Sequence, residues 1–152
     1  MNSKSINHTL RFAENFCIKN GVNFTKKRQD IFRMMLDEDQ ALSAYEIADK
    51  LRNKYQLSVP IMSIYRILDF LVQQNLVHKI TSINKYISCA HITCKCGHAM
   101  PRFIVCIKCL KVKELNSNDS IKKELQVDLD SIDFKLMSQQ VELSGLCKPC
   151  SK

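Results

Sequence analysis

The chain of 152 residues is short of glycine and proline, with three of each. Because these two residues interrupt regular structure most strongly, their scarcity favours helices, above all in the first half of the chain. The sequence also lacks internal repeats, low-complexity tracts and Gly/Ser-rich linkers. Its 45% hydrophobic and 25% charged residues are typical of a folded chain. Together these features exclude a repetitive or globally disordered protein.

Long apolar stretches are absent as well. No segment approaches the roughly 20 apolar residues that span a bilayer, so we expect no membrane partner. The first residues, MNSKSINHTLRFAENF, lack the basic start, apolar core and cleavage site of a secretory signal. We therefore expect a cytoplasmic protein with reduced thiols, in which Cys-x-x-Cys pairs indicate metal ligands or catalytic thiols before disulfides.

Signatures of zinc enzymes are also missing. The sequence has no His-Glu-x-x-His segment, and it lacks the His-x-Glu that deaminases combine with Pro-Cys-x-x-Cys. A catalytic zinc needs an open coordination position, and a site in which four protein side chains bind the metal has none. We therefore expect neither an enzyme nor a small-molecule substrate.

Basic residues are in excess, with a formal charge of +8 and a pI near 9.1. The amino-terminal half is the more basic. This charge suits a polyanionic partner such as nucleic acid, although many proteins are basic for solubility alone. The motifs have to decide between these two explanations.

The first half of the chain predicts a winged helix-turn-helix domain. Apolar spacing and capping signals predict four helices, and two strands follow as a hairpin. The helices are expected at 6–17, 25–38, 43–55 and 60–74, and the strands at 76–81 and 85–89. In such a domain the helix beginning near Pro60 enters the DNA major groove and the hairpin touches the backbone.

Several polar residues of this domain could face DNA. Ser63, Arg66 and Asp69 share one face of the Pro60 helix by their spacing. Lys27 and Arg28 fall in the first turn of the second helix, where the helix dipole disfavours cations. A phosphate bound there would explain them, and a solvated charge cluster is the ordinary alternative.

The second half predicts a small α/β domain. Two strands, PRFIVC and KVKELN, flank a Cys-x-x-Cys turn, and a helix and a further strand, NDSIKKELQVDLD and FKLMSQQVELSGLC, follow. The expected fold class is therefore α+β. The expected organisation is a winged-helix DNA-binding domain at 1–83, a hinge at 84–92 and a zinc-binding dimerisation domain at 93–152.

Two Cys-x-x-Cys pairs predict a structural zinc site. Four thiolates can close a tetrahedral site, the usual structural zinc arrangement. The 37 residues between the pairs exceed a zinc-ribbon loop, so a folded unit must lie between them. The alternative is a pair of redox dithiols, but the βαβ context of a thioredoxin motif is missing. The ligands are Cys106, Cys109, Cys147 and Cys150.

The remaining cysteines suggest a second metal site. A lone strand histidine is more often a surface residue than a ligand. Here, however, Cys89 is followed at once by a His-x-x-Cys-x-Cys-x-His run, which favours a metal. The candidates near this run and on the strands are His78, Cys89, His91, Cys94, Cys96, His98 and Glu114.

The chain resembles the ferric uptake regulator family, and within it the zinc uptake regulator branch. The segments that carry the resemblance are FTKKRQDIF, LSAYEIADKLR, IYRILDFLVQQNLVHKI, NKYISC, FIVCIKCLKVKEL and GLCKPC, in the family's order. The resemblance implies a homodimeric, metal-dependent transcriptional repressor that binds an operator inverted repeat in double-stranded DNA and controls zinc-uptake genes. It also implies Zn²⁺ at two sites per chain.

The resemblance also implies roles for single residues. Structural zinc falls on the four cysteines named above. Tyr45 and Arg66 match base-contacting positions, and Tyr65 matches a position close to DNA. An Arg guanidinium suits guanine because it can donate to O6 and N7 together. The regulatory zinc of the zinc-sensing branch falls on His78, Cys89, His98 and Glu114.

Two departures from the family pattern keep alternatives open. The His-His-x-His segment of iron-sensing members is absent, which weakens an iron- or peroxide-sensing interpretation, although spacing alone leaves iron, manganese or nickel open. Cys94 and Cys96 are extra. Either could replace Cys89, the pair could form a third site with His91, or they could act as redox-sensing or zinc-buffering thiols.

Overall fold

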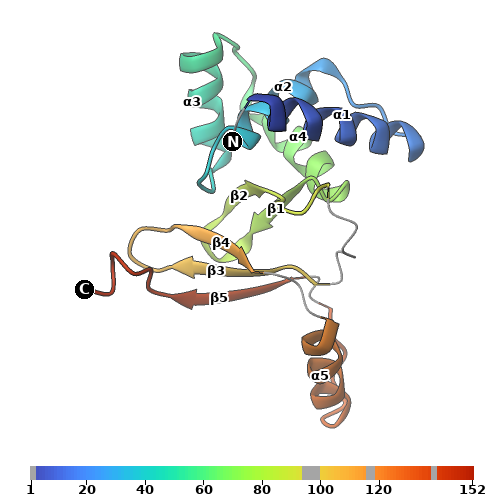
Figure 1. Ribbon diagram of the computed structural model, residues 1–152, viewed down its shortest axis with the longest axis vertical. Coiled ribbons are helices and arrows are strands. Elements are labelled where there is room, and N and C mark those ends of the chain that lie inside the picture. Colours follow the sequence, from blue (N-terminus) through green and yellow to red (C-terminus); the bar gives the residue numbers. More distant parts are fainter. Residues whose placement is uncertain (1–2, 94–99, 116–118, 138–139) are drawn as a thin grey trace. The chain divides into compact units, whose positions relative to one another are not determined.

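A computed structural model describes residues 3–93, 100–115, 119–137 and 140–152. Its contacts divide the chain into two units, Met1–Cys94 and Lys95–Lys152. The first unit is helical and carries a two-stranded hairpin, and the second contains a three-stranded sheet and a helix (Figure 1). The predicted α+β class, a winged helix followed by a small α/β unit, is confirmed.

The four helices of the first unit form close to the predicted ranges, although α1 begins three residues earlier than expected. They are α1 (Ser3–Lys19), α2 (Lys26–Leu36), α3 (Ala44–Tyr55) and α4 (Ile61–Gln73). The backbone N–H of Glu46 donates to Ser43 Oγ at 3.2 Å, and Ser43 N–H donates to Glu46 Oε2 at 2.6 Å. This is the predicted capping box, which satisfies two otherwise unpaired donors at the start of α3.

The start of α4 differs by one residue from the expectation. Pro60 caps the helix instead of occupying its first position, because its ψ of 140° is extended. The carbonyl of Pro60 still accepts the first helical hydrogen bond, from the N–H of Ile64 at 3.1 Å. No helix in the described part of the chain combines the length and apolar character needed to cross a membrane.

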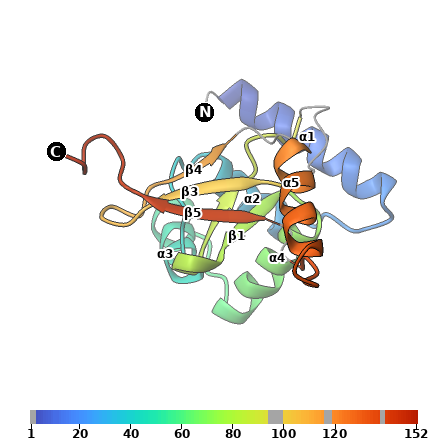
Figure 2. The ribbon, with the colours of Figure 1, turned by 90° about the horizontal axis from the view of Figure 1, so that it is seen from below.

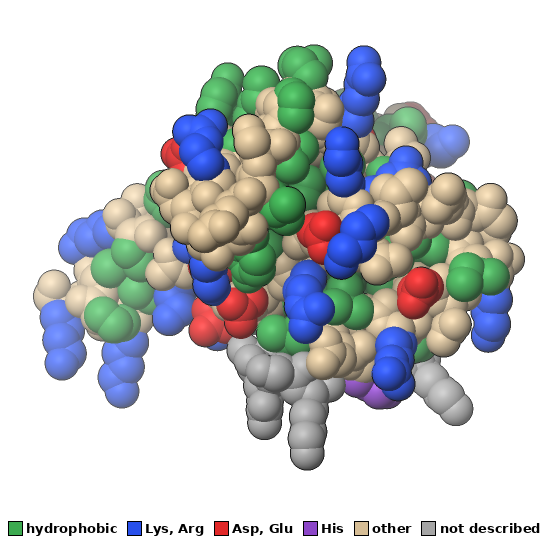
Figure 3. All heavy atoms as spheres, turned by 90° about the horizontal axis from the view of Figure 1, so that it is seen from above, with side chains coloured by type: hydrophobic (Ala, Val, Ile, Leu, Met, Phe, Trp, Pro, Cys, Tyr) green, Lys and Arg blue, Asp and Glu red, His purple; other side chains and the backbone are tan. Residues whose placement is uncertain are grey.

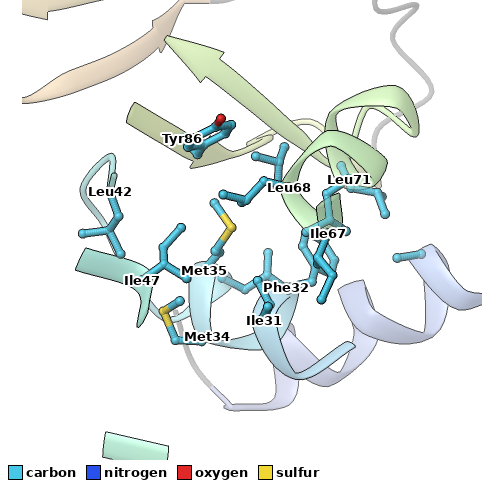
Figure 4. Close-up of a cluster of buried hydrophobic side chains, with 14 of the residues drawn as sticks. Ile31, Phe32, Met34, Met35, Leu42, Ile47, Ile67, Leu68, Leu71 and Tyr86 are labelled. Carbon is cyan, nitrogen blue, oxygen red and sulfur yellow. The ribbon is translucent and has the colours of Figure 1, made fainter. Parts of the chain in front are cut away.

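The core of the first unit lies between α2, α3, α4 and the hairpin. Side chains from all four elements converge there (Figure 4). The helical stripes predicted from spacing supply most of this core, and burying each large aliphatic or aromatic side chain contributes about 1.5–3 kcal/mol. Residues with at most 3% of their surface exposed include Ile31, Phe32, Met35, Ile47, Leu51, Ile64, Leu68, Leu71 and Tyr86.

The hairpin is tied to the chain just before α3. Strands β1 (Val77–Ile80) and β2 (Lys85–Ser88) pair antiparallel around a short 3-10 turn. Leu42 and Tyr86 exchange two backbone hydrogen bonds of 2.8 and 2.7 Å, so Leu42 extends the hairpin by one bridge. Because β2 belongs to the first unit, the predicted hinge at 84–92 includes this strand of the hairpin. Movement within that range stays a prediction.

The second unit is built on one central strand. It contains β3 (Arg102–Cys106), β4 (Val112–Leu115), α5 (Asp119–Asp130) and β5 (Val141–Gly145). Strand β3 pairs antiparallel with β4 and parallel with β5, so the sheet order is β4-β3-β5 (Figure 2). The parallel pair requires a crossover, which passes through α5. The predicted last strand is shorter than expected and is confined to Val141–Gly145 among the described residues.

Candidate metal centres and DNA-facing residues

The four predicted structural ligands come from two turns at one end of the sheet. Cys106 ends β3 and Cys109 lies in the loop before β4, while Cys147 and Cys150 follow β5. Because β3 and β5 are parallel, their carboxyl ends lie at the same end of the sheet, as Figures 1 and 2 show. The sheet topology therefore brings together two pairs that are far apart in the sequence.

The sulfur positions fit a four-thiolate zinc site. The four Sγ atoms lie within 4.8 Å of one another, and those of Cys109 and Cys147 are 3.6 Å apart. A disulfide would require about 2.05 Å. With Zn–S bonds of about 2.3 Å, a tetrahedral site separates its sulfurs by about 3.8 Å. The described donor set is therefore shaped for a tetrahedral metal ion.

Hydrogen bonds prepare one thiol of this cluster for the thiolate state. Backbone N–H groups of Cys109 and Cys147 donate toward Cys106 and lower its pKa to about 6, and the Cys147 N–H to Sγ distance is 3.4 Å. Hydrogen bonds with the side chains of Cys147 and Cys109 raise the pKa of Cys150 to about 12. Four thiolates this close repel one another, so a cation is needed to hold them all ionised.

Two features beside this cluster were not predicted. Lys108 Nζ donates to the carbonyl of Cys150 at 2.8 Å and so ties the first turn to the second. Leu110 has a φ of 58° in the left-handed region, where glycine is the usual residue, and its N–H donates to the Cys106 carbonyl at 2.8 Å. A lysine inside the first Cys-x-x-Cys was visible in the sequence, but its partner was not.

Two predicted regulatory ligands meet on the hairpin of the first unit. His78 pairs with Ile87, and the Cys89 N–H donates to the Leu76 carbonyl at 3.0 Å. His78 and Cys89 are therefore diagonal neighbours on one face of the ladder. A ring nitrogen of His78 and the Sγ of Cys89 lie within 4.8 Å, and both residues are buried. Imidazole and thiolate together suit zinc.

The other regulatory candidates lie outside the hairpin. Glu114 lies on β4 of the second unit and is half-buried. His91 follows the hairpin, and its backbone N–H donates to Cys89 Sγ at 3.4 Å, a contact through the main chain rather than the imidazole. His98, Cys94 and Cys96 fall outside the described residues, so their roles stay predictions.

The predicted base-contacting side chains point outward from the first unit. Tyr45, in the first turn of α3, is 66% exposed, and Arg66 is exposed on α4. Ser63 is half-buried. Tyr65 is half-buried against the core, which gives it a packing role in addition to any contact with DNA. The two helices therefore present Tyr45 and Arg66 to solvent.

The two cations at the start of α2 differ from each other. Lys27 is exposed, whereas Arg28 is half-buried. The Arg28 guanidinium lies 3.6 Å from the centre of the Phe70 ring, and it donates a hydrogen bond to the carbonyl of Asn23. Lys27 is therefore the better candidate for a phosphate contact, and Arg28 holds α2 against α4.

Basic side chains are spread over the face shown in Figure 3. Lys and Arg groups occur across this face, with acidic groups fewer among them. Such a surface is suited to the phosphate backbone, which carries about one negative charge per 1.7 Å of duplex. The predicted partner, double-stranded DNA, fits this distribution.

Comparison with known proteins gives the family. Residues 19–144 match the Ferric uptake regulator family. The chain belongs to this family. It is 33% identical over 150 residues to the zinc uptake regulation protein of Escherichia coli (strain K12), covering 99% of this chain and 85% of the relative. It is also 27% identical over 134 residues to the ferric uptake regulation protein of Helicobacter pylori (strain ATCC 700392 / 26695), covering 88% and 85%.

One solved structure is similar to this chain over nearly its whole length. A structure of a zinc uptake regulator complexed with zinc and DNA matches with a TM-score of 0.83 and 28% identity, covering 99% of this chain and 97% of that one. Membership in the ferric uptake regulator family confirms the resemblance seen in the sequence. The ligand and base-contacting residues remain predictions at the level of single side chains.

Proposed function

We propose that this chain is a zinc-responsive transcriptional repressor, which binds an operator inverted repeat as a metal-loaded homodimer and controls zinc-uptake genes. The observation that carries the proposal is the TM-score of 0.83, over 99% of the chain, to a zinc uptake regulator complexed with zinc and DNA. The 33% identity to a zinc uptake regulation protein favours zinc over iron as the signal. On this proposal the chain is not an enzyme and acts in the cytoplasm.

The structural site on this proposal is formed by Cys106, Cys109, Cys147 and Cys150. Its support is the four-thiolate geometry and the low pKa of Cys106. Zinc bound there supplies cross-links that the small sheet of the second unit cannot replace by hydrophobic burial alone. These four side chains stay ionised and join the turn after β3 to the turn after β5.

The regulatory site on this proposal is formed by His78, Cys89, His98 and Glu114. His78 and Cys89 come from the DNA-binding unit, and His98 and Glu114 from the second unit, so a zinc ion held by all four would restrict how the two units move. Zinc bound there supplies the link between them. Changing a population from 1:99 to 99:1 needs about 5.5 kcal/mol of differential binding, which is within reach of four ligands. Cys94, Cys96 and His91 are the alternative ligands, or a third site.

A second copy of the chain is the proposed partner of the second unit. Ile104 on β3 and its register partner Leu143 on β5 are 36% and 46% exposed on one face of the sheet. Phe134, beyond α5, is 65% exposed. A dimer would cover these apolar groups and give two α4 helices, which reach half-sites one helical turn, about 34 Å, apart.

The experiment measures zinc per chain and DNA affinity together, at buffered free zinc. The DNA is a duplex enriched from a random library by the zinc-loaded protein. The variants are His98→Ala, the double variant Cys94→Ser/Cys96→Ser, and His8→Ala as a control, since His8 is an exposed residue of α1. We expect two zinc ions in the wild type, one in His98→Ala, and DNA binding that appears only as the second ion is bound.

Each result decides a different part of the proposal. If His98→Ala bound DNA normally with zinc removed, zinc would not be the switch. Loss of one zinc and of DNA binding in the double variant would move the regulatory site to Cys94 and Cys96. If mild peroxide abolished DNA binding of the zinc-loaded wild type, a thiol redox sensor would replace the zinc sensor. Unchanged behaviour of His8→Ala is required in every case.

A further inference from the structure

Helix α4 presents an outward face with three different chemistries. Met62, Arg66 and Asp69 follow one another at spacings of four and three residues, and all three are exposed. The opposite face is in the core, with Ile64, Ile67, Leu68 and Leu71 buried. The outward face thus runs from a thioether to a guanidinium to a carboxylate.

Met62 is the residue of this face that the predicted functions leave unused. It is 63% exposed in the first turn of α4, and its neighbours on the face are charged. Single exposed apolar residues are common on protein surfaces. This one, however, lies at the amino-terminal end of the second helix of a helix-turn-helix, which is the part of such a helix that contacts base edges.

Major-groove chemistry indicates what Met62 can recognise. The thymine C5 methyl is the apolar group that bases expose in the major groove, and apolar side chains contact it. Met is flexible and polarisable, so it adapts well to a methyl-sized partner. Arg66, four residues further along α4, has the geometry to bind guanine O6 and N7.

We propose that Met62 is a specificity-determining residue, whose side chain contacts the methyl group of a thymine close to the guanine that Arg66 binds. Four residues of helix span about 6 Å, and base pairs are stacked about 3.4 Å apart. The thymine is therefore about two base pairs from that guanine. The inference rests on the proposed function, because α4 must enter the major groove.

The test uses the full-length, zinc-loaded protein and the duplex enriched by the wild type from a random library. Each thymine is replaced by uracil in turn, symmetrically in both half-sites, which removes only the C5 methyl. Affinities are measured for the wild type, for Met62→Ala and for Ile18→Ala. Ile18 is a matched control because it is 67% exposed on α1.

We expect the effect of Met62→Ala and the effect of removing one thymine methyl to be non-additive. For the wild type, uracil at one thymine weakens binding about fourfold per half-site, the value for one buried methyl group. Met62→Ala weakens binding to the thymine duplex by at least as much and no longer distinguishes thymine from uracil there. Its melting temperature and the salt dependence of its affinity match the wild type, because Met62 makes no phosphate contact. Ile18→Ala keeps the thymine preference.

Two results would overturn the inference and are distinguishable. If the wild type enriches a duplex but Met62→Ala retains every thymine-to-uracil effect, Met62 does not contact a thymine methyl, and the proposed function stands. If the zinc-loaded wild type enriches no duplex, the proposed function fails and the inference fails with it.

Discussion

The guanidinium of Arg28 lies over one ring of a stacked aromatic pair in the first unit. It is 3.6 Å from the centre of the Phe70 ring, and the rings of Phe70 and Phe24 are stacked with centroids 6.4 Å apart. A cation over an aromatic ring contributes about 0.5–2 kcal/mol, more as water is excluded. Arg28 therefore joins the start of α2 to α4. Its neighbour Lys27 is exposed, as the proposed phosphate contact requires.

This difference predicts separate effects for two neighbouring substitutions. Arg28→Ala should lower the free energy of unfolding by about 1–2 kcal/mol, because it removes the ring contact and the hydrogen bond to Asn23. Lys27→Ala should change it by less than about 0.5 kcal/mol. It should instead reduce the salt slope of DNA binding by about 1 per chain. Urea unfolding measures the first quantity, and affinities at several salt concentrations measure the second. The assignment would be contradicted if Lys27→Ala lowered the free energy of unfolding and Arg28→Ala reduced the salt slope.

At the scale of elements, an ion pair joins the β1–β2 hairpin to α3, next to the exposed Tyr45 in the sequence. Lys85 Nζ on β2 lies 2.9 Å from Glu46 Oε1 on α3, and the Glu46 carboxylate also accepts the Ser43 N–H. Burial raises the pKa of Glu46, but hydrogen bonds from Lys85 and Ser43 outweigh burial and bring it below the usual 4.5. One carboxylate thus connects the helix cap to the hairpin.

The lowered pKa of Glu46 predicts a pH-dependent effect. A group with a depressed folded-state pKa stabilises the fold fully above its unfolded pKa, and this contribution disappears as pH falls through the folded value. Glu46→Gln should therefore destabilise the first unit at pH 7, by less than about 1 kcal/mol because the side chain is partly exposed. The difference from wild type should vanish at pH values well below 4.5.

Thermal unfolding between pH 7 and pH 3 measures this difference. Glu124→Gln, at an exposed position of α5, is the control and should show no comparable trend. Zinc loss in acid affects all three proteins alike, so the comparison between them remains valid. A constant difference between Glu46→Gln and wild type across this range would mean that the charge of Glu46 does not contribute.

Whether a contact could be predicted from the sequence depends on how close its two residues are along the chain. The capping box of Ser43 and Glu46 was predictable because both residues lie in one helical turn. The contacts of Glu46 with Lys85 and of Arg28 with Phe70 were not, because tertiary packing brings distant segments together. For the same reason, spacing predicted which four cysteines come together, but not the hydrogen bond of Lys108 to the second turn.

At the scale of the whole molecule, the two units depend on different stabilising forces. The first contains the large apolar cluster around α2, α3 and α4. In the second, Phe103, Val105 and Val112 are buried on β3 and β4, while many of the described apolar residues, such as Val127 and Phe134, are exposed. A small unit with few buried side chains commonly needs a metal. Metal loss should therefore affect the second unit far more than the first.

Replacing one structural ligand tests this dependence. Cys106→Ser should lower the zinc content by one ion per chain and unfold the second unit, because three thiolates no longer close the site. Amide hydrogen exchange should become fast at β3–β5 and remain slow in α2–α4. Cys17→Ala is a suitable contrast, since Cys17 is fully buried in the helical core. It should lower protection in the first unit and keep the zinc content.

Retained zinc and retained protection of β3 and β5 in Cys106→Ser would contradict the structural role of the site. Loss of protection in the first unit alone would contradict the division of stability between the units. In either case the exchange pattern, resolved by peptide, identifies which part of the assignment fails.

The parallel pairing of β3 with β5 also sets an order of events during folding. The β3–β4 hairpin closes locally, whereas β5 can pair with β3 only after the intervening chain, including α5, has turned back. Cys106 and Cys109 are therefore positioned early, and Cys147 and Cys150 arrive in a later and slower step. Between these steps the new chain exposes two of the four cysteines, Cys106 and Cys109. Their thiols can capture a metal ion or be oxidised. If the proposed site binds zinc, we expect the zinc supply at that moment to affect how many new chains mature, before any question of gene control arises.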